Sequence, residues 1–369
     1  MLLATIGRFH FLEQARALEA AGRLTRHYCD DPRVLSLGRR GAWLPRVAAE
    51  FRWRCRSSPC EAHRWAGSRL ARLARVHPAP RINSAFALET LRQGDPAWVD
   101  HGSLDERWVR HVLDEEARAW GAPLMSQGGN HGKSWLVDRQ SEEFERAVGV
   151  VVASELAKQT LVSEGVPGVK IRVVTLGVDR QRFQPLPFRE PGRPFRFVHA
   201  GPVSFNKGVH RLIRAFGSLL IPRAELWIVG SFANDSTERW LRRQARGLPV
   251  RFLPPVPQPA LPRLFSQCDA FVLASLADGF GLTVLQALAC GVPAVVSRWA
   301  GCSGILPQNG PVRVTGIEVR ELAESMASLR EWRESSGPER SRTLSRESVD
   351  GLDWPAHAAC LARQMEAIA

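Results

Sequence analysis

Lysine, tyrosine and long apolar segments are scarce in this sequence of 369 residues. Only four of its 50 basic residues are lysines, and it contains one tyrosine. No apolar run approaches the roughly 20 residues that a membrane-spanning helix needs. The start of the chain also lacks the basic segment and the apolar stretch of a secretory signal. We therefore expect a protein of the cytoplasm.

The cysteines do not form a recognisable pattern. The sequence contains seven of them, an odd number, and no two have the C-x-x-C spacing. Scattered cysteines of this kind are typical of reduced thiols and not of a disulfide framework or a zinc site. Since no D-x-D pair of carboxylates ends an expected strand, no metal site and no cofactor are expected either.

Positive charge is in clear excess. The formal net charge is +13, although 44% of the residues are hydrophobic and 24% are charged, as in a globular protein. This composition excludes a mainly disordered chain. The arginine bias is compatible with a GC-rich genome, or with an anionic partner such as nucleic acid, a membrane surface or a phosphate-bearing substrate.

One arginine-rich segment, residues 33–81, interrupts the regular pattern of the chain. It has twelve arginines against two acidic residues, and it also contains tryptophans. A helix here would be amphipathic with a cationic border, carried by Arg64, Arg69, Arg72 and Arg75. The segment is either an ordinary helix with a basic exposed face, or a helix whose apolar side chains dip into an anionic membrane, or a nucleic-acid contact.

Strand and helix signals alternate in two stretches of the chain. The segment between them, residues 183–194, has four prolines and cannot continue a helix or a central strand. Short apolar runs without polar alternation indicate parallel strands covered on both faces. They occur at residues 1–6, 148–153, 171–176, 195–200, 225–229, 250–253, 270–274 and 294–297. Ligands of such sheets bind at the carboxyl ends of the strands.

The most informative of these carboxyl ends lies within residues 274–293. A strand is followed by a turn with Gly279 and Gly281, and a helix begins near Leu282. Glycines let a phosphate approach the backbone, and the first amides of the helix have no partners within it. Asp278 lies at the mouth of this turn, and Gln286 lies two helical turns into the helix.

This run resembles the signature of GT-B glycosyltransferases of family 4, E-G-F-G-L-x-x-x-E-A-x-A-x-G-x-P-V. Residues 199–216, with Lys207, resemble the first strand, the phosphate-binding lysine and the following helix of that family's second domain. Residues 225–230 and 154–183 resemble further segments of the family, and Trp354 begins a stretch similar to its C-terminal helix. The resemblance covers residues 148–369.

The resemblance implies an α/β protein of the GT-B class, with two Rossmann-like domains facing each other across a cleft. Residues 1–185 would form the acceptor domain, with a helix over 354–369 packing back on it. Residues 195–350 would bind the nucleotide-sugar. The family assigns catalytic roles to Asp278 and Lys207. Donor contacts would come from the residues that match its motifs: Gly201, Lys207, Asp278, Gly279, Phe280, Gly281, Leu282, Thr283 and Gln286.

The sequence departs from the family at three of its functional positions. Asp278 and Gln286 replace the two glutamates, and Pro202 replaces an arginine. A hydrogen bond from a neutral group contributes about 1 kcal/mol, against about 1.5–3 kcal/mol for a charged one. The resemblance therefore implies weaker donor binding through Gln286 than through a glutamate.

Candidate residues also occur in the first domain. His101 ends an expected strand, and we take it as the candidate cleft histidine with a catalytic role. Gly7, Arg8 and His10 follow the first strand and are candidates for the acceptor or the cleft. His131 lies in a glycine-rich loop and is a further candidate for acceptor contact.

The expected activity is transfer of a sugar from a nucleotide-sugar to an acceptor hydroxyl, with retention at the anomeric carbon and without a metal. The expected acceptor is a glycan or lipid-linked glycan of a bacterial envelope. The protein could then contact the inner face of the cytoplasmic membrane peripherally. Three alternatives remain: a scaffolding partner built on a weakened transferase, a sugar-nucleotide epimerase and a nucleic-acid binder.

Overall fold

In a computed structural model of the chain, the described residues are 2–5, 11–29, 37, 41–44, 58–74, 81–121, 134–187, 192–219 and 222–366. They form two compact units. Unit 1 comprises Met1–Arg110, Asn130–Leu176 and Trp354–Ala369, and unit 2 comprises His111–Gly129 and Gly177–Asp353. Among the described residues, no helix is both long and apolar enough to cross a bilayer.

Unit 1 contains a seven-stranded parallel sheet with the strand order β3-β2-β1-β4-β5-β6-β7. Its strands are β1 (Leu2–Thr5), β2 (Arg26–Cys29), β3 (Gly41–Trp43), β4 (Arg81–Asn83), β5 (Trp98–His101), β6 (Gly149–Val152) and β7 (Ile171–Val173). Because all neighbouring pairs are parallel, every carboxyl end lies at one edge of the sheet.

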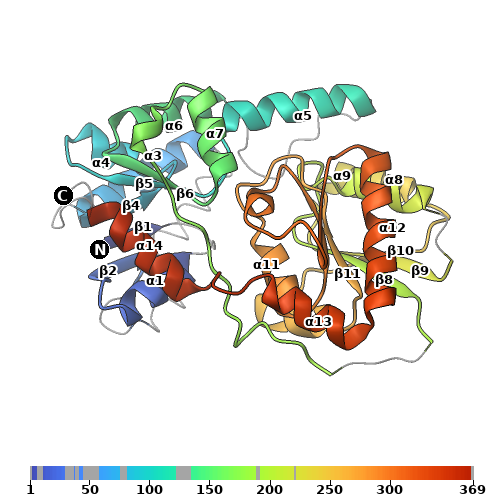
Figure 1. Cartoon of the computed structure of the whole chain (residues 1–369). Helices are drawn as coiled ribbons and strands as arrows, with labels where there is room; N and C mark the ends of the chain where they lie inside the picture. The colour runs from blue at the N-terminus through green and yellow to red at the C-terminus, as the bar shows by residue number, and fades with distance from the viewer. Residues whose placement is uncertain are drawn as a thin grey trace. The chain divides into compact units, whose positions relative to one another are not determined.

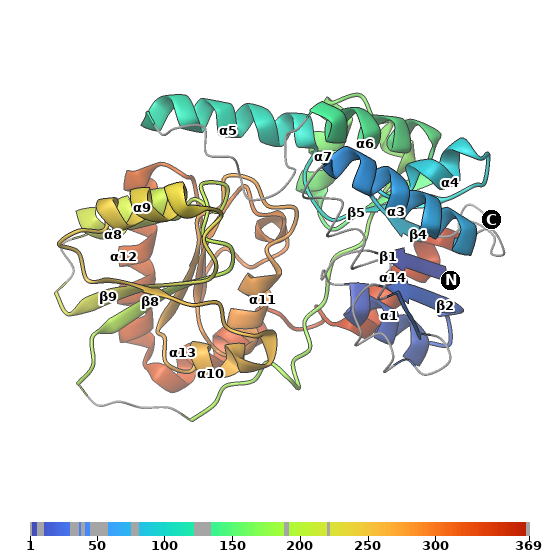
Figure 2. The same ribbon diagram turned by 180° about the vertical axis from the view of Figure 1, so that it is seen from behind.

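Helices cover both faces of this sheet (Figure 1). They are α1 (Phe11–Ala20), α3 (Pro59–Ala74), α4 (Leu88–Arg92), α6 (Ser134–Arg146), α7 (Glu155–Ser163) and α14 (Trp354–Glu366). α1 and α14 lie on one side, and α3, α4 and α6 lie on the other, as the view from behind also shows (Figure 2). A hydrogen bond of 3.0 Å between Gln14 and His357 joins α1 to the C-terminal helix.

Unit 2 contains a six-stranded parallel sheet with the order β10-β9-β8-β11-β12-β13. Its strands are β8 (Phe195–Ala200), β9 (Ala224–Val229), β10 (Val250–Leu253), β11 (Ala270–Leu273), β12 (Ala294–Ser297) and β13 (Val312–Thr315). Counted within the unit, this is the strand order 3-2-1-4-5-6 of a dinucleotide-binding fold. The order reverses between β8 and β11, so a ligand is expected at the carboxyl ends of these two strands.

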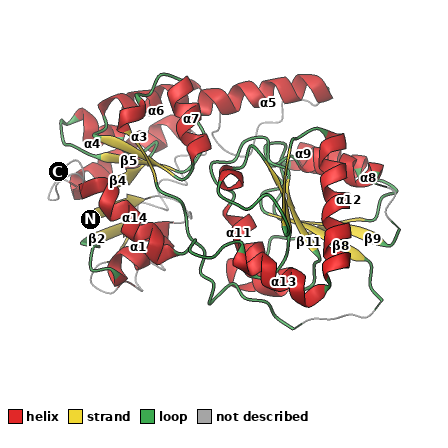
Figure 3. Ribbon diagram, viewed as in Figure 1, coloured by secondary structure: helices red, strands yellow, loops and turns green. Residues whose placement is uncertain are grey.

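The helices of unit 2 lie on both sides of its sheet (Figure 3). They are α8 (Val209–Ser218), α9 (Asp235–Gln244), α10 (Leu261–Phe265), α11 (Leu282–Ala289), α12 (Val319–Ser336) and α13 (Pro338–Glu347). Buried side chains of α8 and α12, including Leu212, Phe216 and Met326, pack on Val272 and Val295 of the sheet. The core of the unit therefore lies between its sheet and the helices α8 and α12.

The division into units differs from the domain boundaries expected from the sequence, 1–185 and 195–350. The segment after Gly177 belongs to unit 2, where Arg346 Nη1 donates to the carbonyl of Phe183 at 3.4 Å. α5 (Glu106–Trp120) was expected in the first domain, but its residues from His111 onward also belong to unit 2. Local sequence patterns do not reveal these long-range contacts.

The helix α3 uses its apolar face within unit 1. Ala66, Leu70 and Ala71 are fully buried, whereas Arg64, Arg69 and Arg72 are exposed. The side chain of Leu70 is part of the core of unit 1, which favours the interpretation of this segment as an ordinary amphipathic helix with a basic exposed face. What α3 presents at its surface is positive charge.

Candidate active site

The glycine-rich turn of unit 2 lies between β11 and α11. Gly281 caps α11 with a φ of 87°, in the left-handed region that favours glycine. A Cβ there would approach Leu273 Cδ2 to 2.8 Å, so the position has no room for a side chain. The first amides of α11, at Leu282 and Thr283, have no partner within the helix and follow the carboxyl end of β11.

Lys207 reaches this turn from the loop that follows β8. Its Nζ donates to Asp278 Oδ2 at 2.7 Å, and both side chains are partly exposed, at 20% and 14%. The structure thus brings together two residues that are 71 positions apart in the sequence. They come from the loops after β8 and β11, on either side of the reversal in strand order.

Backbone contacts fix the two loops against each other. The amide of Leu276 donates to the carbonyl of Asn206 at 2.8 Å. Gly208 has a φ of 64°, and a Cβ there would lie 1.8 Å from the carbonyl oxygen of Ala274. Only glycine allows this close approach.

Asp278 is itself fixed within its turn. The amide of Phe280 donates to Asp278 Oδ1 at 3.2 Å, and the amide of Asp278 donates to the carbonyl of Trp299 at 2.9 Å. The Phe280 side chain is buried, as is Gly279. The Asp278 carboxylate is held by the Phe280 amide at Oδ1 and by Lys207 at Oδ2.

Two further donor candidates of unit 2, Gly201 and Gln286, lie after β8 and on α11. Gly201 has a φ of 153° at the end of β8, and its carbonyl oxygen would lie 1.8 Å from a Cβ on Gly230. Gln286 is 5% exposed on α11, and its side chain makes no hydrogen bond to any residue of the described chain. Its amide group is therefore available to a ligand.

His199, at the end of β8, is buried beneath the loop. Its ring nitrogens lie 3.3 Å from the carbonyl of Val272 and 3.4 Å from that of Pro202. Burial lowers the pKa of His199 to about 4, so the ring is neutral at pH 7. A neutral imidazole can donate to only one of these carbonyls. The buried ring lies against Pro202, in the loop that follows β8.

His101 lies at the carboxyl end of β5 in unit 1 and is fully buried. Its Nε2 donates to the carbonyl of Leu104 at 3.2 Å, and its Nδ1 lies 3.0 Å from Ser84 Oγ. Burial lowers the pKa of His101, so the neutral ring accepts the Ser84 hydroxyl proton at Nδ1. Its catalytic role stays a prediction, and Ser84 is the half-buried member of this hydrogen-bonded pair.

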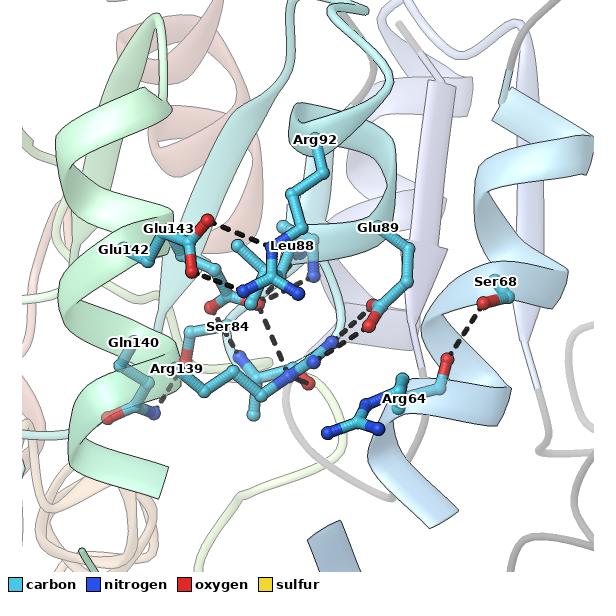
Figure 4. Close-up of polar contacts among 12 residues, drawn as sticks. Arg64, Ser68, Ser84, Leu88, Glu89, Arg92, Arg139, Gln140, Glu142 and Glu143 are labelled. Atoms are coloured by element: carbon cyan, nitrogen blue, oxygen red, sulfur yellow. Dashed lines mark hydrogen bonds and ion pairs between the residues drawn. The ribbon is translucent and has the colours of Figure 1, made fainter. Parts of the chain in front are cut away.

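Side chains of α6 hold the loop that carries Ser84 (Figure 4). The carboxylate of Glu143 is fully buried and accepts the amides of Ala85 at 2.7 Å, Ala87 at 2.9 Å and Leu88 at 3.0 Å. Arg139 Nε donates to the carbonyl of Ala85 at 2.6 Å. Burial raises the pKa of Glu143 to about 7, against the opposing effects of Arg139 and the three amides.

Sequence reasoning missed Ser84 and Glu143. They are separated in the chain by more than 50 residues, and no local motif marks either of them. Ser204 was also missed: its Oγ accepts the amide of Lys207 at 3.3 Å and shapes the lysine loop. The candidates Gly7, Arg8, His10 and His131 lie outside the described residues.

Comparisons with known proteins show what the sequence of this chain is similar to. Residues 194–331, which include both halves of the Lys207–Asp278 pair, match the family model "Glycosyl transferases group 1". The glycogen synthase of Mycobacterium tuberculosis is 26% identical over 336 residues, covering 88% of this chain and 72% of that protein. The D-inositol 3-phosphate glycosyltransferase of Pseudarthrobacter chlorophenolicus is 28% identical over 279 residues, covering 66% and 65%. The chain is a glycosyltransferase.

Solved structures support the fold of this glycosyltransferase. Sucrose-phosphate synthase from Thermosynechococcus elongatus superimposes with a TM-score of 0.73 at 18% identity, over 100% of both chains. The Anabaena protein HepE, solved with UDP-glucose, superimposes with a TM-score of 0.69 at 16% identity, also over 100% of both chains. The expected GT-B fold is confirmed.

Proposed function

We propose that this glycosyltransferase is a retaining enzyme of family 4 that moves a sugar from a nucleotide-sugar to an acceptor hydroxyl without a metal. The contact of 2.7 Å between Lys207 and Asp278 is the observation that carries the proposal. It places a cation and a carboxylate at the reversal of strand order, beside free helix amides.

The chemistry requires positive charge at this place. When the bond between the anomeric carbon and the diphosphate breaks, negative charge grows on the leaving nucleoside diphosphate. Lys207 and the first amides of α11, at Leu282 and Thr283, stabilise that charge, as groups that are already oriented before the reaction. A bound diphosphate replaces Asp278 as the partner of Lys207, and the released carboxylate accepts hydroxyl groups of the donor sugar. The family resemblance implies retention.

The nucleotide is bound further along α11. Gln286 lies on the second turn of this helix, buried and without a hydrogen-bonding partner among the described residues, and we assign to it the ribose hydroxyls. The complex of HepE with UDP-glucose makes a uridine nucleotide the first donor to test. Several curated relatives carry the name D-inositol 3-phosphate glycosyltransferase, which makes phosphate-bearing acceptors reasonable candidates.

We propose that unit 1 binds the acceptor, a glycan or lipid-linked glycan of a bacterial envelope, in the cytoplasm or at the inner face of the cytoplasmic membrane. Ser84 and His101 at the carboxyl edge of its sheet are the candidate contacts. The exposed arginines of α3 favour an anionic surface nearby.

A nucleotide screen tests this proposal. UDP, GDP, ADP and CMP are added separately at saturating concentration, and the melting temperature is measured. We expect one nucleotide to stabilise the protein by about 2.7 kcal/mol at 100 times its Kd. Hydrolysis of the corresponding nucleotide-sugars is then measured. Binding without turnover would favour the scaffolding alternative, and absence of binding for all four would contradict the proposal.

A further inference from the structure

The second half of α5 is part of unit 2, although it precedes the rest of that unit by more than 50 residues. Glu116 and Trp120 are four residues apart and therefore lie on the same side of the helix. Glu116 is 6% exposed, whereas the side chain of its neighbour Glu115 is 58% exposed. The end of α5 lies beside α8 and α9 (Figure 2).

Glu116 forms a buried ion cluster with the start of α8. Its carboxylate accepts hydrogen bonds from Arg211 Nε at 2.5 Å and Arg211 Nη2 at 2.6 Å, and a further one from His210 Nε2. His210 is fully buried and Arg211 is 8% exposed. A buried carboxylate is tolerated only with such partners. The ion cluster therefore fixes which side of α5 packs against α8.

An aromatic cluster continues from these ion pairs. The rings of Trp120 and His210 have centroids 4.9 Å apart, and Trp120 also meets Trp240 of α9 at 6.3 Å. Phe205 packs on the same two residues, at 4.6 Å from His210 and 5.2 Å from Trp240. Trp120 and Phe205 are thus joined through His210 and Trp240, which contact both.

Phe205 belongs to the loop that carries Lys207. The amide of Gly208 donates to the carbonyl of Phe205 at 2.7 Å, closing a turn around Lys207. Phe205 is 8% exposed, so its ring cannot leave the cluster without moving this turn. The position of the Lys207 backbone therefore depends on the packing of Phe205.

We propose that Glu116 and Trp120 are positioning residues for Lys207, acting through His210, Trp240 and Phe205. The donor loop of unit 2 is then supported by a helix from the first half of the chain. This inference rests on the proposed function, in which Lys207 binds the diphosphate of the donor.

The experiment compares Trp120→Ala with Trp120→Phe in the full chain. Amide hydrogen exchange is measured over residues 203–210 and over β12, and UDP, GDP, ADP and CMP are titrated by calorimetry. For Trp120→Ala we expect faster exchange at Lys207 and Gly208 by about tenfold, unchanged exchange in β12, and a Kd weakened by about tenfold. Trp120→Phe keeps an aromatic ring, so its exchange rate at these residues and its Kd should stay close to those of the wild type.

A second pair of variants separates the ion cluster from general effects of charge. Glu116→Gln should loosen the same loop, whereas the exposed Glu115→Gln should leave its exchange unchanged. If Trp120→Ala does not fold, Trp120→Leu keeps apolar volume without the ring.

The outcomes test the positioning role and the proposed function separately. Unchanged exchange at residues 203–210 in both Trp120→Ala and Glu116→Gln would overturn the positioning role, as would an equal increase in β12. If the wild-type protein binds none of the nucleotides, the proposed function fails, and the exchange data still decide the inference.

Discussion

Lys207 and Asp278 form the pair on which the reaction is expected to depend. Both side chains are only partly exposed, at 20% and 14%. Their contact at 2.7 Å arises because the loops after β8 and β11 meet where the strand order reverses. The lysine is held by Ser204 and by the turn that Gly208 closes, so its charge is oriented before the donor arrives.

Replacing Lys207 tests this arrangement. We expect Lys207→Ala to lower turnover of the nucleotide-sugar by at least about 10²-fold, because loss of one preorganised group that stabilises developing charge typically has this effect. Turnover is measured by release of the nucleoside diphosphate. Arg214→Ala, which removes an exposed cation from α8, is the matched control. A Lys207→Ala enzyme within threefold of the wild type would exclude the lysine from phosphate binding.

Glu116 makes stability depend on acidic pH. Burial alone would raise its pKa, but the hydrogen bonds from His210 and Arg211 outweigh burial and lower it from 4.5 to about 2. Because the folded-state pKa lies below the unfolded value, the ionised group stabilises the fold above about pH 4.5. This stabilisation is lost as the pH falls from about 4.5 toward 2, at about 1.4 kcal/mol per pKa unit.

The corresponding measurement compares melting temperatures between pH 7 and pH 3. Glu116→Gln should melt below the wild type at pH 7, and the difference should shrink as the pH falls below 4.5. Glu115→Gln, which changes an exposed carboxylate one position away, should show neither effect. A constant difference across this range would mean that Glu116 has an ordinary pKa.

At the scale of elements, the loop after β8 packs closely against the loop after β11, and this contact requires a glycine. Gly208 lies against the carbonyl of Ala274, with a φ of 64°. We expect Gly208→Ala to destabilise the protein by about 2–5 kcal/mol, from left-handed strain together with displaced backbone, and to abolish nucleotide binding.

Gly247 provides the matched control for this substitution. Its φ is 77°, but a Cβ there would meet nothing within 4 Å. Gly247→Ala should therefore show only the strain of about 1–2 kcal/mol, with nucleotide binding retained. Chemical denaturation and calorimetry measure both quantities. Equal destabilisation by the two variants would show that the contact with Ala274 is not important.

At the scale of the whole molecule, the net charge of +13 has a local counterpart on α3. Arg64, Arg69 and Arg72 are exposed, and each contributes about 1 kcal/mol near an anionic surface. We expect co-sedimentation with anionic phospholipid vesicles at low salt, and no co-sedimentation with neutral ones. Replacing the three arginines with glutamine should release the protein and leave nucleotide binding unchanged.

The control removes the same charge elsewhere. Arg239, Arg320 and Arg340 are exposed in unit 2, and their replacement by glutamine should leave vesicle binding intact. If both triple variants are released equally, net charge alone is responsible. Sedimentation with neutral vesicles would contradict an electrostatic contact.

Several strands and helices of unit 2 could be predicted from its sequence. The strands over 195–200, 250–253 and 294–297 were predicted with the bounds observed, and so was the start of a helix at Leu282. These elements are short, largely apolar and bounded on at least one side by glycine or proline, so local composition determines them. The chain also contains β13, α12 and α13, which the sequence reading did not include, and unit 1 was predicted only in part.

The sequence by itself determined the parallel α/β class, the glycine turn at 279–281 and the candidates Lys207 and Asp278, because each depends on residues that are neighbours in the chain. Only the tertiary structure decided that these two side chains meet, that Glu143 holds the loop of Ser84, and that α5 supports the donor loop. Such contacts join residues separated by more than 50 positions. These contacts depend on which side chains the fold buries together and which hydrogen bonds they then form. A local sequence pattern contains no information on either.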